Sequence, residues 1–500
     1  MGQDFLWGAA ISGYQSEGGY NRPGEPQTNW AEAESRSKVD PVGNASDFLT
    51  HYPEDLERCR VLGLNAFRLS IEWSRVQPTL VNAVSTPPDF DSEAILRYAR
   101  ILETCRLKGL EPIVTLHHFV HPAWLGADPW LSIAVIEPFT RFVDRVVTEV
   151  NSYLIKRDCE PVRYFITINE PNMLVMSTYL GSQFPSDAPR GVGSAILAIS
   201  NLLKAHLSAY SQVHEIYKSR GWGPVSLTFN NYTSDIYWLD QFLTDLLMLR
   251  DMGVRRSEAI KFLQQRAVSF NQCVDAFSAR HMRWFSRGLG IVLRHLAARL
   301  GRTALRSEAI LSLLEAIYSS PASQMLDLIA FDYYDPFCAH GLRIPRISEW
   351  RVGREFPFDG FGSRFLSRWW DWRVLPEGME FFSELLAANY PGKKLLIAEN
   401  GMAHRRDVDN AHVQRSDGLL RSDFIRLHAA VIDRLLSQQV PLFGYMHWSL
   451  IDNYEWGTYS ARFGLFSLDY AKDMERIAED HYGDRPAETY AGIIRESLQK

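Results

Sequence analysis

The sequence predicts an α/β protein of one domain, a (β/α)8 TIM barrel with long loops after its strands. Short apolar runs alternate with amphipathic stretches along the whole chain, and no repeat, low-complexity tract or composition change divides it. The 500 residues have room for two or three average domains, but barrels of this kind often exceed the usual domain size. We therefore interpret residues 1–500 as a single barrel domain with a divergent helical segment at about 231–326.

Eight runs rich in apolar, β-branched or aromatic residues are the predicted strands. Helix-like segments such as 52–63, 91–109 and 421–438 lie between them, which favours parallel pairing with right-handed crossovers. Eight such units close into a barrel. The competing architecture is an open doubly wound sheet, which is disfavoured because no glycine-rich phosphate turn follows the first run. The runs are residues 5–10, 65–70, 112–118, 163–169, 224–230, 327–334, 394–400 and 441–448.

Composition disfavours several classes of function. A net charge of −6 gives no basic surface typical of a nucleic-acid-binding protein. Five scattered cysteines without a CxxC pair argue against a disulfide framework or a zinc site. We expect them to be buried free thiols in a reducing compartment. Neither a secretory signal nor an apolar run of transmembrane length is found, so we expect a cytoplasmic protein.

Nearly every predicted strand ends in side chains that can meet a ligand. A barrel gathers the carboxyl ends of its strands around one mouth, where active sites form on this fold. Polar strand ends can also be ordinary solvent-facing caps, but their recurrence on every strand favours one shared site. The residues are Arg68, His117, His118, Asn169, Glu170, Asn230, Tyr334, Glu399, Asn400 and Trp448.

Two glutamates at strand ends point to a specific chemistry. Glu170 ends the fourth run in TINEPN, and Glu399 ends the seventh run in IAENG. On an eight-stranded barrel these two ends face each other across the mouth. Cleavage of a glycosidic bond needs one acid to protonate the leaving oxygen and one carboxylate to meet the oxocarbenium carbon. Either glutamate alone has an equally good structural explanation.

With these fragments on the page, the sequence resembles glycoside hydrolase family 1 over nearly its whole length. The resemblance implies a retaining β-glycosidase that hydrolyses terminal non-reducing β-D-glucosides through a covalent glycosyl-enzyme, with β-galactosides and β-fucosides left open. It implies a small-molecule β-glycoside substrate and no metal or organic cofactor. The fragments are FLWGAAISGYQSEGG (5–19), residues 51–78, TLHHFVHPAWL (115–125), TINEPN (167–172), FDYYDPF (331–337), LPEG (375–378), IAENG (397–401) and residues 447–470.

The same resemblance implies a role for each matching side chain. Glu170 would be the acid/base and Glu399 the nucleophile, with Arg68 holding Glu399 ionised and lowering its pKa, and Tyr334 hydrogen-bonding it. Amide, imidazole and carboxylate groups supply donors and acceptors for sugar hydroxyls, and indole stacks on the apolar face of a pyranose. The implied substrate-binding residues are Gln15, His118, Asn169, Asn230, Trp448, Glu455 and Trp456.

Structural explanations compete at some of these positions. Arg68 could pair with a structural acid such as Glu72, and Glu17 reads as a structural residue. A tryptophan cluster at 369–372 is either a loop wall beside the mouth or part of the core. Glu455, next to O4 and O6 of the sugar, would accept hydrogen bonds from hydroxyls but repel a phosphate, which disfavours a 6-phospho-glycosidase.

Three positions depart from the family pattern. Asp332 stands where the family usually has asparagine, Phe119 replaces a common tryptophan, and the segment 457–459 is shorter than usual. Strand alternation puts Asp332 on the same face as Tyr334. An extra acid near the two glutamates would raise pKa values or need its own cation. These departures leave the fine substrate preference open.

Residues 280–307 carry seven arginines and no acid, interleaved with large apolar residues such as Trp284 and Phe285. The pattern predicts a basic amphipathic helix, or two helices broken at Gly288 and Gly290. Such a helix can lie on an anionic membrane or meet a lipid-linked substrate. A barrel also needs covering helices here, so we expect a helix with its apolar face on the sheet and its basic face in solvent.

Two other functions stay open at this stage. A transglycosidase would use the same covalent intermediate and differ only in preferring a sugar acceptor over water. A non-catalytic sugar- or lipid-binding barrel would be expected to lose a catalytic glutamate, and both are present together with Arg68 and Tyr334. The sequence does not indicate the aglycone or the oligomeric state.

Overall fold

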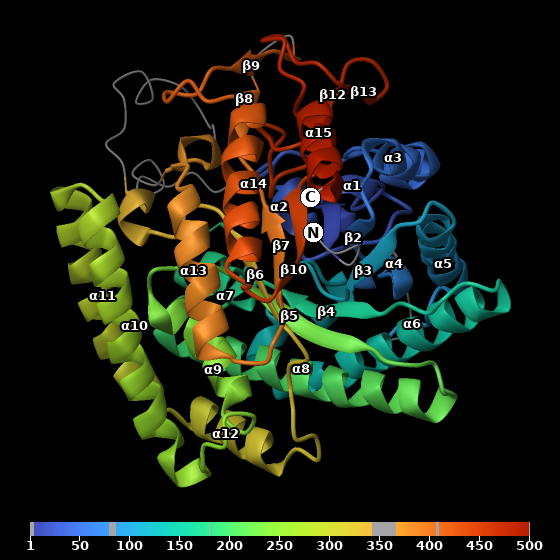
Figure 1. Ribbon diagram of the computed structural model, residues 1–500. Helices are drawn as coiled ribbons and strands as arrows, with labels where there is room; N and C mark the ends of the chain where they lie inside the picture. Colours follow the sequence, from blue (N-terminus) through green and yellow to red (C-terminus); the bar gives the residue numbers. More distant parts are fainter. Residues whose placement is uncertain (1–4, 80–86, 182, 343–366, 407–409, 500) are drawn as a thin grey trace.

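The computed structural model describes residues 5–79, 87–181, 183–342, 367–406 and 410–499. Eight parallel strands close a barrel in the order β1-β10-β7-β6-β5-β4-β3-β2 (Figure 1). This confirms the predicted fold class. The barrel strands are β1 (Leu6–Ala10), β2 (Ala66–Ser70), β3 (Glu111–Thr115), β4 (Tyr164–Asn169), β5 (Ser226–Tyr232), β6 (Ile329–Tyr333), β7 (Leu395–Asn400) and β10 (Leu442–Trp448).

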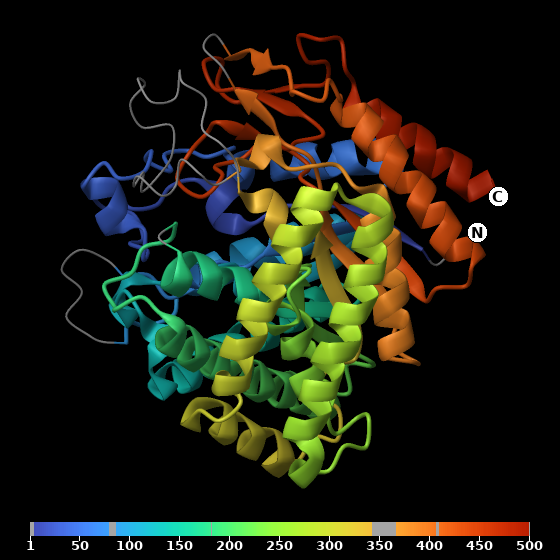
Figure 2. The same cartoon turned by 90° about the vertical axis from the view of Figure 1, so that its left-hand side faces the viewer.

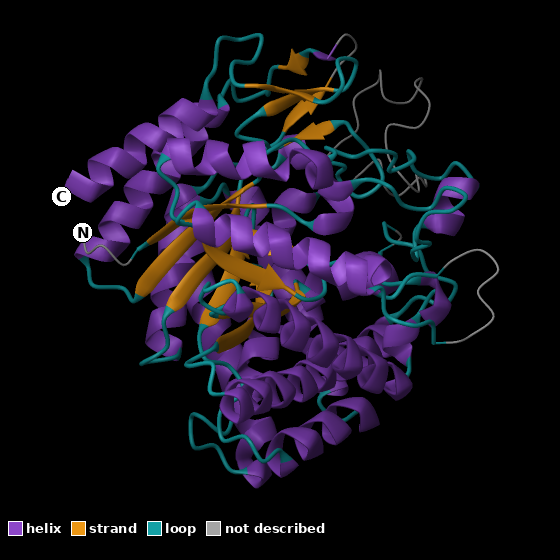
Figure 3. Ribbon diagram, turned by 90° about the vertical axis from the view of Figure 1, so that its right-hand side faces the viewer, coloured by secondary structure: helices purple, strands orange, loops and turns teal. Residues whose placement is uncertain are grey.

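Helices surround the barrel on its outer side (Figure 3). Two small antiparallel sheets lie outside it, one of β8 (His404–Arg406), β9 (His412–Val413) and β11 (Ala461–Arg462), the other of β12 (Ser467–Asp469) and β13 (Glu475–Ile477). The helices are α1 (Gly13–Glu17), α2 (Ala31–Ser35), α3 (Phe48–Leu62), α4 (Trp73–Val76), α5 (Ser92–Leu107), α6 (Ile136–Lys156), α7 (Pro171–Val175), α8 (Val192–Arg220), α9 (Gln241–Met248), α10 (Ala259–His281), α11 (Trp284–Ala304), α12 (Glu308–Ser319), α13 (Pro376–Asn389), α14 (Arg421–Ser437) and α15 (Pro486–Gln499).

All eight predicted strands are present, but the third is shorter than expected. The prediction extended it to residue 118, whereas β3 ends at Thr115. The Leu116 amide still donates to the Ile166 carbonyl of β4, and the chain then turns at Phe119, whose φ is +67°. Leaving the strand early separates two neighbouring histidines. His117 packs edge-on against Trp130, and His118 lies beside Trp448.

Side chains of alternating size fill the barrel interior. Ala10, Ala66, Ile113, Ile166 and Met446 belong to one buried cluster inside it. A second and larger cluster lies between the strands and the helices. This division is typical of the fold, in which inward-pointing side chains form a packed core and not a pore. A ligand site on this barrel is therefore expected at its mouth.

Helix α8 is long and apolar enough to cross a membrane by length and composition. In the folded chain 61% of its apolar window is buried, and the helix packs against α6 and α12. Core helices of globular proteins pass the same test of composition.

The five cysteines are all free, but only Cys59 and Cys105 are buried. The expectation of buried thiols is wrong for the other three, which are half-buried.

The arginine-rich segment forms one continuous helix, α11, so Gly288 and Gly290 do not break it. Helices α10 and α11 run antiparallel over one flank of the barrel (Figure 2). The buried side of α11 carries small residues, and a Cβ added at Gly301 would come within 2.0 Å of the Trp238 ring. Close approach of the helix therefore depends on these small residues.

The expected split of α11 into an apolar inner face and a basic outer face is wrong in two respects. Five large apolar side chains are exposed: Trp284, Phe285, Val292, Leu296 and Leu300. Arg294 is buried, and its guanidinium pairs with Asp235 at 2.8 Å and with Asp275 at 2.5 Å. The reason is that small residues line the inner face, so the large apolar groups have no room there.

Candidate active site

The end of β4 places Glu170 at the mouth of the barrel. Glu170 is the residue before α7, with Pro171 starting that helix, and it adopts a left-handed conformation with φ 36° and ψ 62°. Its amide donates to the Asn230 carbonyl of β5 at 2.9 Å. A left-handed conformation is unfavourable for a residue with a Cβ by about 1–2 kcal/mol, and such strain is common at functional sites.

Glu399, near the end of β7, is held by two partners: Arg68 of β2, which is not adjacent to β7, and Tyr334, just after the adjacent strand β6. Arg68 Nη1 lies 2.7 Å from Oε1, and the Tyr334 hydroxyl donates to Oε2 at 3.0 Å. Arg68 is itself fixed, because its Nε donates to Thr115 Oγ1 and its Nη1 to the Ala398 carbonyl. Arg68 therefore pairs with Glu399 and not with Glu72, which accepts from Ser70.

The two glutamates differ in protonation. Burial raises the pKa of Glu399, while Arg68 and the Tyr334 hydroxyl act in the opposite direction. Arg68 acts on the pKa of Glu399 in the expected direction, lowering it, but burial outweighs Arg68 and the net shift is upward. Glu399 is nevertheless the ionised partner, since a buried arginine stays charged and needs a carboxylate beside it. Burial and the charges of Asp332 and Glu399 raise the pKa of Glu170 well above its usual range.

The carboxyl groups of Glu170, Asp332 and Glu399 form one compact cluster. One oxygen of each lies within 4.8 Å of the others, and all three residues are buried. Asn230 Nδ2 donates to Asp332 Oδ2. The aspartate at residue 332 therefore lies in the same carboxyl cluster as Glu170 and Glu399.

Two asparagines connect these groups and leave polar atoms for a ligand. Asn169 Oδ1 accepts from Arg68 Nη2 at 2.5 Å and from Asn230 Nδ2 at 2.8 Å. Among the described residues, nothing pairs with Asn169 Nδ2 or Asn230 Oδ1, although both atoms are buried. Buried polar groups nearly always have partners. One free donor and one free acceptor beside the carboxylates are suited to a sugar hydroxyl.

The other predicted substrate-binding residues form a second group at the mouth. Gln15 Nε2 in α1 donates to Glu455 Oε2 at 3.0 Å. The His118 ring lies parallel to the rings of Trp448 and Trp456, with centroids 5.9 Å away in each case. Burial and the charge of Arg68 lower the pKa of His118, so its imidazole is neutral. Burial raises the pKa of Glu455, and the charge of Glu399 raises it further. The two carboxyl groups are therefore close enough to interact electrostatically.

Some residues that shape the site gave no signal in the sequence. Gln15 is oriented by Ser12, whose hydroxyl donates to its Oε1 at 2.6 Å, and by Asn453, whose Oδ1 lies 3.4 Å from its Nε2. Thr115 fixes Arg68 from the neighbouring strand. Thr115 and Asn453 lie far from their partners in the chain, so only the fold brings them together. Asn453 is the exception to the missing signal, because it lies in the pattern HWSLIDNYEWG (447–457).

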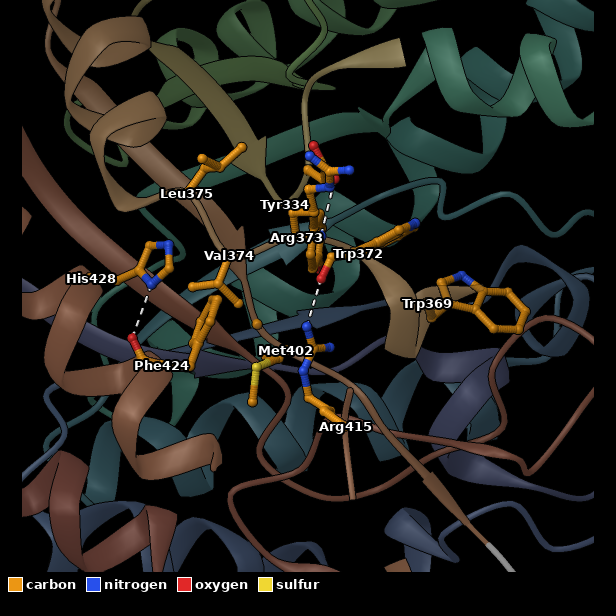
Figure 4. A pocket seen from close by; sticks show the side chains of 12 residues that line it. Tyr334, Trp369, Trp372, Arg373, Val374, Leu375, Met402, Arg415, Phe424 and His428 are labelled. Atoms are coloured by element: carbon orange, nitrogen blue, oxygen red, sulfur yellow. Dashed lines mark hydrogen bonds between the residues drawn. The ribbon is translucent and has the colours of Figure 1, made fainter. Parts of the chain in front are cut away.

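A pocket opens beside Tyr334, between the loops that follow β6 and β7 and helix α14 (Figure 4). Of the predicted site residues only Tyr334 lines it. The Trp372 ring lies 5.3 Å from the Tyr334 ring, and Arg415 holds this loop by donating to the Trp372 carbonyl at 2.7 Å. Trp372 is half-buried, which favours the prediction of a loop wall over that of a core residue.

A cluster of His404, His412 and Asp480 near the small sheet has ligand atoms within 4.8 Å of one another. Such a set could hold a metal ion by composition. Asp480 already faces a cation, because Arg421 Nη2 lies 3.1 Å from its Oδ2. His412 Nδ1 lies 3.3 Å from the same oxygen. We interpret the cluster as a structural ion-pair network that fixes the outer sheet to α14.

Comparison with known proteins identifies the family. The model of the family described as Glycosyl hydrolase family 1 matches residues 1–238 and 281–483. The chain belongs to glycosyl hydrolase family 1. It is therefore a glycoside hydrolase, which overturns the alternative of a non-catalytic binding barrel. The unmatched stretch 239–280 holds α9 and nearly all of α10, inside the divergent segment 231–326.

Individual family 1 relatives are distant but match over full length. A 6-phospho-beta-galactosidase of Clostridium acetobutylicum is 26% identical, with 96% of this chain and 94% of that protein covered. A solved beta-glucosidase from Thermotoga maritima, in complex with noeuromycin, superposes with a TM-score of 0.68 at 22% identity, covering 99% and 98%. The AHE enzyme from Alicyclobacillus herbarius gives a TM-score of 0.67 at 19% identity, covering 100% and 98%. These structural likenesses support the fold alone.

Proposed function

We propose that this family 1 enzyme is a retaining β-glycosidase for terminal non-reducing β-D-glucosides, with Glu170 as acid/base and Glu399 as nucleophile. The observation that carries the proposal is the approach of their carboxyl oxygens to within 4.8 Å. Retaining enzymes have carboxyls about 5–5.5 Å apart, whereas inverting enzymes leave about 6.5–9.5 Å for a water molecule. An approach of one oxygen from each carboxyl to within 4.8 Å supports the shorter, retaining spacing.

In the first step Glu170, protonated because of its raised pKa, gives its proton to the glycosidic oxygen. The Glu399 carboxylate, held ionised by Arg68 at 2.7 Å, attacks the anomeric carbon as the bond to the aglycone breaks. The products are a free aglycone and a sugar joined to Glu399 by an ester bond. Tyr334, which hydrogen-bonds Glu399, keeps the attacking carboxylate in position.

In the second step the charge of Glu399 is absent, because the ester is neutral. The pKa of Glu170 falls as this negative neighbour is lost, so Glu170 stays ionised and accepts a proton from water. The resulting hydroxide attacks the anomeric carbon and releases Glu399 as a carboxylate. Two inversions give net retention of the β configuration.

The sugar preference rests on Glu455. Its buried carboxyl accepts from Gln15, which leaves it able to accept from sugar hydroxyls as well. A phosphate at O6 would add negative charge near the Glu399 carboxylate and would meet the acceptor oxygens of Glu455 instead of N–H donors. For this reason we favour an unphosphorylated glucoside, although one relative is named a 6-phospho-beta-galactosidase. Rates on aryl β-glucoside, β-galactoside, β-fucoside and the two 6-phospho sugars decide between these substrates, and sugar acceptors added to the same assay reveal transglycosylation.

The nucleophile is tested with Glu399→Ala. We expect hydrolysis of an aryl β-glucoside to fall on the order of 10⁴-fold or more, as when other covalent hydrolases lose their nucleophile. Azide should partly restore turnover and give the α-glycosyl azide, because the small anion attacks from the side of the missing carboxylate.

The matched control is Glu170→Ala with an activated aryl glucoside. There azide takes the place of water in the second step, so the product should be the β-glycosyl azide. Opposite configurations in the two variants support the assignment. A β product from Glu399→Ala would show that Glu399 is not the nucleophile.

A further inference from the structure

Asp332, on β6, is a third carboxyl group in contact with the catalytic pair. It is fully buried, and its Oδ2 accepts from Asn230 Nδ2. Within the described chain, no N–H or O–H group pairs with its Oδ1, and none pairs with Glu170 Oε1. One oxygen of each residue lies within the same 4.8 Å cluster. Two buried acceptor oxygens this close repel each other unless a proton lies between them.

Charge balance leaves Asp332 without a cation of its own. The charged and titratable groups around it come from every neighbouring strand. Of these groups only Arg68 is a cation, and it already pairs with Glu399 at 2.7 Å. While Glu399 is ionised, Glu170 and Asp332 therefore cannot both be ionised without a large cost. The groups are Arg68 on β2, His118 after β3, Glu170 after β4, Tyr232 on β5, Tyr334 after β6, Glu399 on β7 and Glu455 after β10.

We propose that Asp332 is a positioning residue for the acid/base, whose carboxylate accepts a hydrogen bond from protonated Glu170, so that the two share one proton in the free enzyme. This inference rests on the proposed role of Glu170. Asp332 Oδ2 accepts a hydrogen bond from Asn230 Nδ2, which favours the ionised form of Asp332. Asp332 is therefore the acceptor in its hydrogen bond with Glu170. A proton shared in this way also fixes which Glu170 oxygen faces the glycosidic bond.

The directions of the pKa shifts agree with this assignment. Burial, the charge of Asp332, the charge of Glu399 and a hydrogen bond to Asp332 all raise the pKa of Glu170. Burial and the charge of Glu399 raise the pKa of Asp332, whereas Arg68 and the hydrogen bonds from Glu170 and Asn230 lower it. The proton therefore sits on Glu170 and points to Asp332. The pair loses it in one macroscopic step.

An asparagine at this position would act in the opposite way. Its amide would donate to the Glu170 carboxylate and stabilise the ionised form, whereas the Asp332 charge destabilises it. The acid form of Glu170 should therefore persist to higher pH in this enzyme than in the Asp332→Asn variant. When water hydrolyses the glycosyl-enzyme in the second step, the negative charge of Asp332 makes Glu170 a stronger base toward that water.

The test is the pH dependence of kcat/KM for a β-glucoside with a poor, alkyl-type leaving group, which needs full protonation by Glu170. In Asp332→Asn the alkaline limb should move to lower pH by about one to three pH units. A merely structural role would lower the rate without moving the limb. Asp327→Asn is the matched control, because Asp327 pairs with His214 and Tyr210 outside the site.

The outcomes separate the two proposals. If the unmodified enzyme cleaves no aryl glycoside, or Glu399→Ala keeps full activity, the proposed function fails. If the enzyme is active but Asp332→Asn has an unchanged alkaline limb, the shared proton is wrong and the proposed function stands.

A second measurement does not depend on the stability of the Asp332 variant. The infrared spectrum of the substrate-free enzyme, minus that of Glu170→Gln, should show the band of a protonated carboxyl group at neutral pH. That band should persist into the alkaline range. A difference spectrum at neutral pH without the band would overturn the proposal.

Discussion

Burial sets the protonation state of several acids in this enzyme, and Glu72 shows the effect outside the catalytic cluster. Its side chain is buried at the start of α4 and accepts from the Ser70 hydroxyl at 2.8 Å. Burial, and then the charge of Glu17, raise the pKa of Glu72 to about 8, although Ser70 and Arg75 act in the other direction. The carboxyl is therefore protonated at neutral pH, and Arg75 pairs with Glu17.

Replacing Glu72 by glutamine should change how stability depends on pH. Below pH ~4.3 the group is protonated in both the folded and unfolded states, so it contributes no slope. Between that pH and about 8 only the unfolded state loses the proton, which costs the unmodified enzyme up to ~5 kcal/mol. Glutamine stays neutral, so Glu72→Gln should gain stability relative to the parent as pH rises from 5 to 8.

Urea unfolding at pH 5, 6.5 and 8 measures this difference. Glu54→Gln, an exposed site on α3, is the control and should follow the parent at every pH. A gap between Glu72→Gln and the parent that is equal at the three pH values would show that Glu72 ionises normally in the folded enzyme.

At single residues, the sequence predicted which side chains meet but not how strongly they are perturbed. The strand-end pattern placed Arg68, Tyr334 and Glu399 together, and the structure joins them by hydrogen bonds. Their catalytic roles remain predictions. The net direction of the Glu399 pKa could not be read from the sequence, because it depends on how deeply the fold buries the carboxyl. The aspartate at residue 332 was visible as a departure, but its contact with Glu170 was not.

At the scale of the elements, helix α11 contains a buried arginine that its basic sequence did not reveal. Arg294 is 3% exposed and lies between Asp235, after β5, and Asp275 of α10. The small residues Ser286, Gly290 and Gly301 share its buried side. Their helical spacing was a signal for a closely packed face, but seven arginines without an acid favoured a solvated one. Contact between the exposed apolar side chains of α11 and a membrane or lipid remains a prediction.

Replacing Arg294 by glutamine should loosen α11 from the barrel. The change leaves Asp235 buried, 1% exposed at its side chain, without its cation. Breaking a buried ion pair in this way costs about 3–5 kcal/mol. The urea midpoint should fall accordingly, while Arg302→Gln on the exposed side of α11 should change stability by less than about 0.5 kcal/mol. Equal effects of the two substitutions on stability would show that the ion pairs of Arg294 do not hold α11 on the barrel.

On the scale of the whole molecule, the number of strands and their order around the barrel follow from the sequence pattern, because each βα unit adds one parallel neighbour. The register does not follow. Strand β10 shifts its pairing with β7 between Leu442 and Gly444 and again between Tyr445 and His447. One shift lies at the start of the strand and the other near its end, and the alternation of residue types in the sequence marks neither. The outer sheet of β8, β9 and β11 was also not predicted, since its strands have only two or three residues.

Closure of the barrel joins the two ends of the chain. Strand β1 pairs with β10 from Leu6 to Ala10, and α15 covers this junction from outside (Figure 1). Tyr490 of α15 is buried, and its hydroxyl donates to the Gly8 carbonyl of β1 at 2.9 Å. Its ring lies 6.0 Å from the Trp7 ring and 6.1 Å from the Tyr445 ring. One side chain thus contacts both the first and the last strand.

We therefore expect Tyr490→Ala to weaken the closure of the whole barrel. Removing a large buried ring costs about 3–5 kcal/mol, because the transferred surface and the cavity both count. Tyr490→Phe keeps the ring and loses only the hydrogen bond to Gly8, about 1 kcal/mol. Leu498→Ala, on the same helix but 60% exposed, should lie within about 0.5 kcal/mol of the parent. Urea unfolding of the three variants measures this order, and an alanine variant as stable as the phenylalanine variant would mean that α15 does not hold the barrel closed.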